Sequence, residues 1–333
     1  MKTSGKIKTV IVVSILIVGL SAPAPGRIIY VDDDATGAND GSSWANAFQY
    51  LQDGLVSVLP APPVHRGDPS PGMKAQAEIR VAQGIYKPQE ATLSNPWVRS
   101  GLQSAPEMAF RLVSGVAIKG GYAGLGASDP NERNPERYQT ILSGDLNGDD
   151  ADVVHARDLS SDPTRAENSH NVVTSDPVAD ANAVLDGCVV TGATRGGLEN
   201  RGGGPSISNC VFLRNAAQPY GGAVRSMTGN LTLTRCRFIA NWAPQFGGAV
   251  DADLGGVILL TDCSFTDNEA EVGGAVASER ADVRMRVKVG HHSRQCIADD
   301  LRVGVQRQHI APARSRQTLV VRRWKAAIVD VGD

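Results

Sequence analysis

The chain repeats one stretch three times, first as Asn209-Cys210-Val211-Phe212-Leu213-Arg214-Asn215 followed by Gly221-Gly222-Ala223-Val224. The other two copies are Arg235 to Asn241 with Gly247 to Val250, and Asp262 to Asn268 with Gly273 to Val276. Because the Gly-Gly-Ala-Val units start at residues 221, 247 and 273, the period is 26 residues. A fixed period of this length is typical of a solenoid, in which each unit buries its apolar side against its neighbours.

Each copy is made of short β-prone segments. Leu231 to Thr234 and Val257 to Leu260 precede the cysteines and place apolar residues at alternate positions, which is the pattern of a half-buried strand. A second strand carries Cys and Phe on one side, and a third begins at Ala-Val after the glycine pair. These features predict an all-β fold, a right-handed parallel β-helix (solenoid), with stacked strands about 4.8 Å apart.

Stacking of equivalent positions predicts three structural ladders in the cylinder. They contain thiols, aromatic rings and amides, namely Cys210, Cys236 and Cys263; Phe212, Phe238 and Phe265; and Asn215, Asn241 and Asn268. The asparagine side chains are expected to hydrogen-bond to the backbone of a turn at one corner of the cylinder. Cys188 falls in the same register. For these cysteines the sequence leaves three possibilities open: buried free thiols, a disulfide in an exported protein, or a metal site.

The chain divides into four regions. Residues 1–26 combine three lysines before Thr9, an apolar core and small residues, which predicts a signal peptide cleaved before Arg27, with an uncleaved anchor as the alternative. Residues 27–76 are expected to form an N-terminal strand and helix cap followed by a Pro-rich loop. The helix is expected over Ala45–Leu59, with the turn Asp40–Ser43 as its N-cap. Such a cap closes the open end of a solenoid.

The β-helix is expected over residues 77–289, with long polar loops at Gly126 to Arg137 and Gly144 to Ala181. The next Cys-x-Phe-x-x-Asn is due near residue 288 and does not occur. Residues 290–333 are therefore expected to form an atypical basic tail outside the packed coils. A truncated gene, a change of reading frame and a natural tail each explain this break.

One acidic stretch resembles the start of a calcium loop, because Asp145, Asn147 and Asp149 place oxygen-bearing side chains at alternate positions. Its glycine comes at the fourth position instead of the sixth, and Ala156 stands where the closing acid belongs. Calcium binding and a solvated acidic turn both remain open here. The run from Asp32 to Asp34 is expected to form a solvated edge of the cap.

Catalytic and sugar-binding candidates are few. Asp251 and Asp253 are the acidic candidates for a groove, since glycoside hydrolysis needs two carboxylates that flank one bond. In the repeat register, however, Asp251 stacks beside Arg225, as in ordinary cross-strand charge pairing. The aromatic residues near the glycine pairs, which are either a sugar-stacking strip or corner packing, are Tyr220, Trp242 and Phe246.

The Phe-x-x-Asn and Gly-Gly-Ala-Val pattern resembles the polymorphic outer membrane protein repeat of bacterial surface β-helices. The front of the chain resembles secreted right-handed β-helix proteins related to the pectate lyases, in Ile29–Asp32, Asn39–Trp44, Ile79–Tyr86, Gly120–Gly124 and Ile141–Asp145. The resemblance spans roughly residues 28 to 286. It implies a fold and leaves the activity open, because this fold hosts lyases, hydrolases and adhesins alike.

These observations predict a secreted, cell-surface or outer-membrane-associated bacterial module for binding, adhesion or structural display, without catalysis. Its expected partner is a polysaccharide or another cell-surface ligand. No cofactor is expected, with calcium as the alternative. A net charge of −2 argues against nucleic acid as a partner, and membrane contact is expected only through an uncleaved signal. The alternative is a carbohydrate-active enzyme, a polysaccharide lyase or a glycoside hydrolase.

Overall fold

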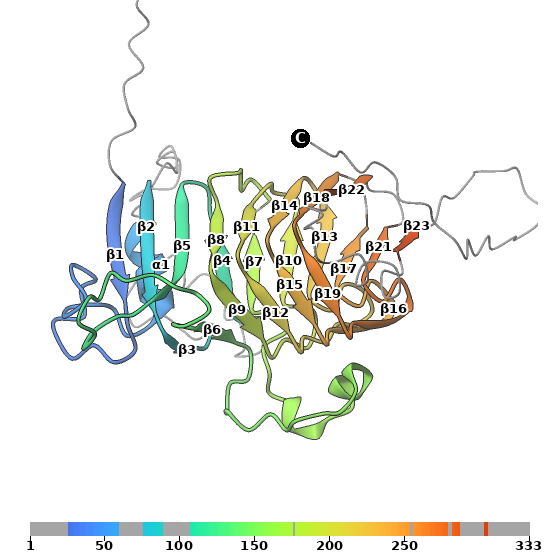
Figure 1. Ribbon diagram of the computed structural model, residues 1–333, viewed down its shortest axis with the longest axis horizontal. Coiled ribbons are helices and arrows are strands. Elements are labelled where there is room, and N and C mark those ends of the chain that lie inside the picture. Colours follow the sequence, from blue (N-terminus) through green and yellow to red (C-terminus); the bar gives the residue numbers. More distant parts are fainter. Residues whose placement is uncertain are drawn as a thin grey trace, which may run out of the picture.

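The computed structural model describes residues 26–59, 76–88, 107–175, 177–253, 256–278, 282–286 and 303–305, which are mostly β-strands in parallel sheets (Figure 1). The first sheet contains, in order, β1 (Arg27–Val31), β2 (Ala77–Ala82), β5 (Val116–Tyr122), β8 (Val184–Asp186), β11 (Ser206–Ser208), β14 (Leu231–Thr234), β18 (Val257–Thr261) and β22 (Asp282–Arg286). The second contains β3 (Gly84–Tyr86), β6 (Thr140–Ser143), β9 (Cys188–Thr191), β12 (Val211–Leu213), β15 (Arg237–Ile239) and β19 (Ser264–Thr266).

The third sheet contains β4 (Phe110–Leu112), β7 (Val173–Ser175), β10 (Leu198–Arg201), β13 (Val224–Thr228), β17 (Val250–Ala252), β21 (Val276–Ser278) and β23 (Val303–Val305). A short fourth sheet pairs β16 (Trp242–Phe246) with β20 (Glu269–Val272). The helices are α1 (Leu51–Val58) and the 3-10 turns η2 (Ala156–Ser160) and η3 (Pro163–Arg165). Each 26-residue repeat thus gives one strand to each of the three main sheets, and equivalent residues pair in register, as in Phe212↔Phe238↔Phe265.

The predicted aromatic ladder is present in the core. The rings of Phe212 and Phe238 are 5.2 Å apart at 8°, and those of Phe238 and Phe265 are 4.9 Å apart at 9°. Phe212 and Phe238 are fully buried, whereas Phe265 is half-buried. The stack arises because parallel pairing in register places identical side chains one above the other.

The asparagine ladder is a continuous chain of hydrogen bonds. Asn241 Oδ1 accepts the backbone N–H and the Nδ2 of Asn215, both at 3.0 Å, and Asn268 Oδ1 accepts the same two groups of Asn241 at 3.0 and 2.9 Å. Arg214 and Ala240, which precede two of these asparagines, have left-handed backbones with φ of 52° and 51°. The asparagine amides therefore supply hydrogen bonds to buried backbone groups of the turn, which cannot pair with a neighbouring strand.

A second buried polar ladder runs along the third sheet and was not anticipated from the sequence. Ser175 Oγ donates to Asn200 Oδ1 at 2.6 Å, and Asn200 Nδ2 donates to Ser226 Oγ at 3.0 Å. All three side chains are buried. The ladder spans three repeats, and its polar atoms satisfy one another because successive residues stack in register.

The cysteines at positions 188, 210, 236 and 263 are free thiols. The first three are buried, and Cys263 is half-buried at the last repeat. Burial raises the pKa of the Cys210 thiol to about 12. A hydrogen bond to Cys263 and burial raise the pKa of Cys236, whereas the same hydrogen bond lowers the pKa of Cys263. These four cysteines therefore form no disulfide in the structure.

The helix expected over Ala45–Leu59 is shorter than predicted. Helix α1 spans Leu51–Val58, and Tyr50 is its N-cap without a side-chain hydrogen bond. Phe48 instead forms an isolated parallel bridge to Val31, and the residues before it form bends and turns. Asp40 does not cap the helix, because its Oδ1 accepts the N–H of Ser42. Tertiary pairing with β1 thus overrides the helical periodicity of residues 45–50.

Two boundaries drawn from the sequence are also wrong. The stretch Gly144 to Ala181, expected as one polar loop, contains strand β7 of the third sheet. Residues 290–333, expected outside the coils, include β23, which pairs in parallel with β21 through Val276↔Val303. Residues 1–25 of the predicted signal peptide, most of the expected Pro-rich loop, Cys296 and the remainder of the expected tail lie outside the described residues.

Replacing Phe238 by alanine removes the central ring of the aromatic ladder. We expect a loss of roughly 3 kcal/mol in the free energy of unfolding, measured by urea denaturation, because the site is fully enclosed. Phe246→Ala is the matched control, since Phe246 is half-buried and contacts the ring of Tyr220. Equal losses for the two variants would contradict the inward register described here.

Thiol labelling reports on the cysteine ladder. At pH 8, iodoacetamide should modify Cys263 first, because its pKa is lowered and its side chain is half-buried. Cys188, Cys210 and Cys236 should react only after unfolding in urea. Peptide mass spectrometry distinguishes the sites, and modification of Cys236 as fast as Cys263 in the folded protein would refute this order.

Candidate functional site

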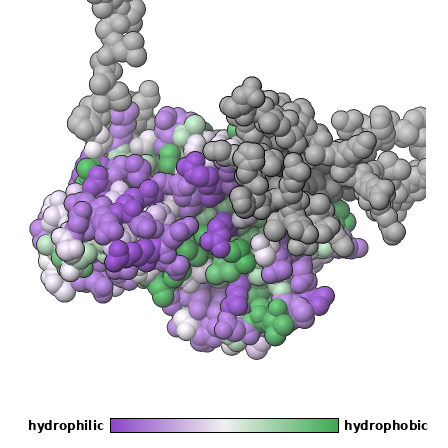
Figure 2. All heavy atoms as spheres, viewed as in Figure 1, coloured by the Kyte–Doolittle hydropathy of each residue, from purple (hydrophilic) through white to green (hydrophobic). Residues whose placement is uncertain are grey.

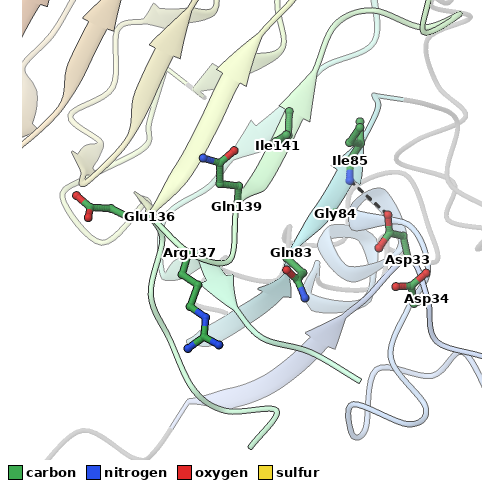
Figure 3. Close-up of a pocket in the computed structure, with 9 residues that line it drawn as sticks. All are labelled: Asp33, Asp34, Gln83, Gly84, Ile85, Glu136, Arg137, Gln139 and Ile141. Carbon is green, nitrogen blue, oxygen red and sulfur yellow. Dashed lines mark hydrogen bonds between the residues drawn. The ribbon is translucent and has the colours of Figure 1, made fainter. Parts of the chain in front are cut away.

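A cleft of about 420 Å³ lies beside the first strands (Figure 3). Its walls come from the turn after β1, the start of β3, and the segment that leads into β6. Its lining residues are Asp33, Asp34, Gln83, Gly84, Ile85, Glu136, Arg137, Gln139 and Ile141. Figure 3 shows Glu136 and Arg137 on one side and Asp33 and Asp34 on the other, with Gln83 and Gln139 between them.

Gly84 allows the acidic wall to approach β3. Asp33 Oδ2 accepts the N–H of Ile85 at 3.3 Å, so the Asp33 carboxylate lies directly over the start of this strand. A Cβ atom at position 84 would stand 2.4 Å from Asp33 Oδ1, and Gly84 has a φ of 147°. Any other residue here would displace the carboxylate and strain the backbone.

The acidic run next to the cleft is only in part the solvated edge that the sequence suggested, because Asp33 and Asp34 are exposed and Asp32 is buried. Asp32 is only 2% exposed, and its two carboxylate oxygens accept the N–H groups of Asp34 and Leu125 at 3.1 and 2.6 Å. Burial raises the pKa of Asp32, and these hydrogen bonds oppose the rise. Burial also raises the pKa of Asp33, but its side chain is exposed, so solvent screening limits that shift. Asp32 therefore positions the turn, and Asp33 and Asp34 face the cleft.

The chemistry of the cleft suits hydrogen bonding to a polar ligand. Gln83, Glu136, Arg137 and Gln139 are exposed, and Ile85 adds an apolar surface that is 57% exposed. Arg137 is held only loosely, by Glu132 at 3.5 Å and by the ring of Tyr138. Planar amide, carboxylate and guanidinium groups beside an apolar surface can bind a ring that carries hydroxyl groups.

The predicted acidic pair does not form a groove of carboxylates. Strand β17 places Asp251 in register with Arg225, and Asp251 is 2% exposed. Asp253 Oδ2 accepts from Arg225 Nη2 at 3.0 Å. Asp253 thus pairs with the Arg225 guanidinium, Asp251 is the in-register neighbour of the same arginine on the adjacent strand, and neither aspartate lines the cleft.

The predicted aromatic strip is divided between two places. Tyr220 and Phe246 pack against each other with ring centroids 5.6 Å apart, and Arg225 lies 5.3 Å above the Tyr220 ring. Trp242 instead packs against an apolar cluster that Ala216 forms with Ala156 and Leu159 of the segment between β6 and β7. Corner packing, the second of the two interpretations, fits these contacts better than an open stacking surface.

The three residues predicted to bind calcium do not come together as one group in the structure. Asp145 Oδ1 accepts the N–H groups of Gly148 and Asp149, so it closes its own turn. Asn147 and Asp149 are exposed, and Asp149 is not among the carboxylates that gather here. That group consists of Asp145, Asp150 and Glu167, with one oxygen from each within 4.8 Å of the others. Burial raises the pKa of Asp150, Arg165 opposes the rise, and the charges of Asp145 and Glu167 add to it.

Sequence reasoning missed Gln83, Glu136, Arg137 and Gln139, because nothing in their local sequence distinguishes them from other surface residues. Neither a family model, a curated protein nor a solved structure matches this chain. Within the described part of the chain, no helix has the length and apolar character needed to cross a membrane. Function is therefore inferred from the cleft and the side chains around it.

Proposed function

We propose that this chain is an exported bacterial right-handed parallel β-helix that binds a polysaccharide at the cell surface or outside the cell. The fold part of this proposal is supported by the strand order, because successive strands enter three parallel sheets in rotation. Parallel crossovers are almost always right-handed. In this proposal β1 and α1 form the cap, since α1 contacts β1, β2 and β4 at the N-terminal end. Export is supported by the apolar segment after Lys8 and by the resemblance to surface repeats.

The cleft carries the binding part of the proposal. It collects amide, carboxylate and guanidinium groups from three separate segments around one exposed isoleucine. Three carboxylates, on Asp33, Asp34 and Glu136, line it against the single guanidinium of Arg137. Because this excess of negative charge repels polyanions, the ligand is a neutral polysaccharide rather than a polyuronate.

A single substitution in the cleft tests this assignment. Arg137→Ala removes the only guanidinium of the lining and should weaken binding of neutral polysaccharides at least tenfold, measured by affinity gel electrophoresis with glucan, mannan and galactan. Arg201→Ala is the matched control, because Arg201 is also exposed but pairs with Glu199 on the third sheet. It should leave binding unchanged.

The binding assignment fails if none of the neutral polysaccharides retards the protein, or if Arg137→Ala and Arg201→Ala behave alike. Polygalacturonate serves as the charged comparison in the same gels. Stronger retardation by polygalacturonate than by the neutral polymers would contradict the charge argument, because the cleft carries more carboxylates than cations.

A carbohydrate-active enzyme is the second candidate, and one observation favours it. Asp33, whose pKa burial raises, lines the same cleft as Asp34 and Glu136. Glycoside hydrolysis uses one protonated and one ionised carboxyl group on either side of the glycosidic bond. The cleft is shallow and its carboxylates are exposed, whereas catalysis gains most from a water-excluding site. Binding without turnover therefore remains the first proposal.

We expect the protein to release neither unsaturated nor reducing sugars from polygalacturonate, with or without calcium. Asp251 and Asp253 both adjoin Arg225 instead of forming a pair across a groove. Product absorbance and a reducing-sugar assay measure the two activities. Calcium-dependent release that Asp251→Ala abolishes would overturn this expectation, and hydrolysis of a neutral glycan lost in Asp33→Asn would establish the enzyme alternative.

A further inference from the structure

The segment between β6 and β7, residues 144–171, projects from the strands and is called here the lobe. Figure 1 shows it below the second sheet, and Figure 2 shows a separate protrusion with hydrophilic and hydrophobic residues side by side. It is attached through an apolar cluster of Ala156, Leu159 and Ala216, against which Trp242 packs, and through ion pairs of Arg157 with Glu269 and of Asp152 with Arg214. Most of its remaining residues are polar, so apolar burial alone explains little of its ordered conformation.

Three carboxylates meet where the lobe leaves and rejoins the coils. Oxygens of Asp145, Asp150 and Glu167 lie within 4.8 Å of one another. The Asp150 carboxylate accepts from Arg165 Nη1 at 2.7 Å and from Asn168 Nδ2 at 3.0 Å to each oxygen. Arg165 is the one cation whose contact with these carboxylates the described residues show, so three negative charges face one positive charge. Carboxylates this close repel one another unless a further cation joins them.

Buried polar atoms that lack hydrogen-bond partners are concentrated in the same region. Four of the six such side-chain atoms in the described chain belong to residues 165–169, namely Arg165 Nε, Glu167 Oε1, Asn168 Oδ1 and Ser169 Oγ. Asn168 is 1% exposed, its Nδ2 donates to both oxygens of Asp150, and its Oδ1 is the atom of this amide that lacks a partner. An unsatisfied buried oxygen costs about 1–3 kcal/mol, so a ligand that accepts electron pairs from Glu167 and Asn168 would relieve this cost.

The other acidic group of the described chain lacks this feature. Asp32, Asp33 and Asp34 also lie close together, but the oxygens of Asp32 accept two backbone N–H groups, and an Asp33 oxygen accepts a third. No side-chain atom of these three residues is buried without a partner. Asp145 of the lobe also accepts backbone N–H groups, so the two acidic groups differ in the buried unpartnered oxygens of Glu167 and Asn168.

We infer that Asp145, Asp150 and Glu167, together with the amide oxygen of Asn168, form a binding site for a divalent cation of the calcium type. All the donors are oxygens, which hard cations prefer, and calcium accepts an irregular set of six to eight oxygens that water can complete. The ion joins residues 145–150 to residues 167–168 and so closes the lobe at its base. Arg165, which also donates to the carbonyls of Ala193 and Arg214, then ties that base to the second sheet.

Calorimetric titration of the full chain with calcium chloride, after removal of metals with EDTA, tests this site. We expect one ion per chain, with a dissociation constant in the range of about 10⁻⁶ to 10⁻³ M for a site of this kind. Glu167→Gln preserves size and removes one charge, so it should weaken calcium binding at least tenfold. Asp149→Asn is the matched control and should change the affinity by less than about twofold, because Asp149 is exposed and lies outside the group.

Amide hydrogen exchange locates the ion independently. Calcium should slow exchange across residues 144–171 in the wild type but not in Glu167→Gln, and should leave the strands of the first sheet unchanged. The site is refuted if the wild type shows neither binding heat nor slower exchange at 10 mM calcium. It is also refuted if Glu167→Gln binds as the wild type does, or if Asp149→Asn or Asp33→Asn abolishes binding instead.

Discussion

Parallel pairing in exact register is the constraint on which the rest of this structure depends. Strands of the three main sheets place their residues over the equivalent residues of the preceding strand, as in Val224↔Val250↔Val276. Among the described strands of these sheets the register shifts only at Asn200/Arg201 and Arg80/Ala82. A buried side chain therefore meets its own equivalents above and below. The core tolerates a phenylalanine, an asparagine or a thiol at a given position provided that the neighbouring repeats supply a matching group.

Polar groups can be buried under this constraint at little cost. Asn215, Asn241 and Asn268 satisfy one another and the left-handed turns beside them. Ser175, Asn200 and Ser226 do the same on the third sheet. Such ladders penalise a shift of register, because sliding a strand by one residue would leave buried amides and hydroxyls without partners. Shape and hydrogen bonding thus select the same alignment.

A binding site has to lie outside the ladders, because stacked side chains from equivalent positions of successive repeats fill the interior. Both candidate sites, the cleft and the acidic group, are built from loops that leave the sheets. The cleft joins the turn after β1 to the segment before β6, and the acidic group joins the two ends of the lobe. The proposed roles differ accordingly: the cleft is open and offers hydrogen-bonding groups to a sugar, whereas the group in the lobe is half-buried and short of positive charge.

The sequence by itself determined the period, the parallel strands and the identity of the stacked residues, including the phenylalanine and asparagine ladders. These features follow from local chemistry that recurs every 26 residues. Only the tertiary structure decided where α1 begins, that β7 interrupts a polar stretch and that β23 pairs with β21. It alone placed Asp33 and Arg137 on opposite sides of one cleft, and brought Asp150 close to Glu167. No repeat relates those positions, and their proximity depends on how irregular segments fold back over the sheets, which short-range sequence patterns do not encode.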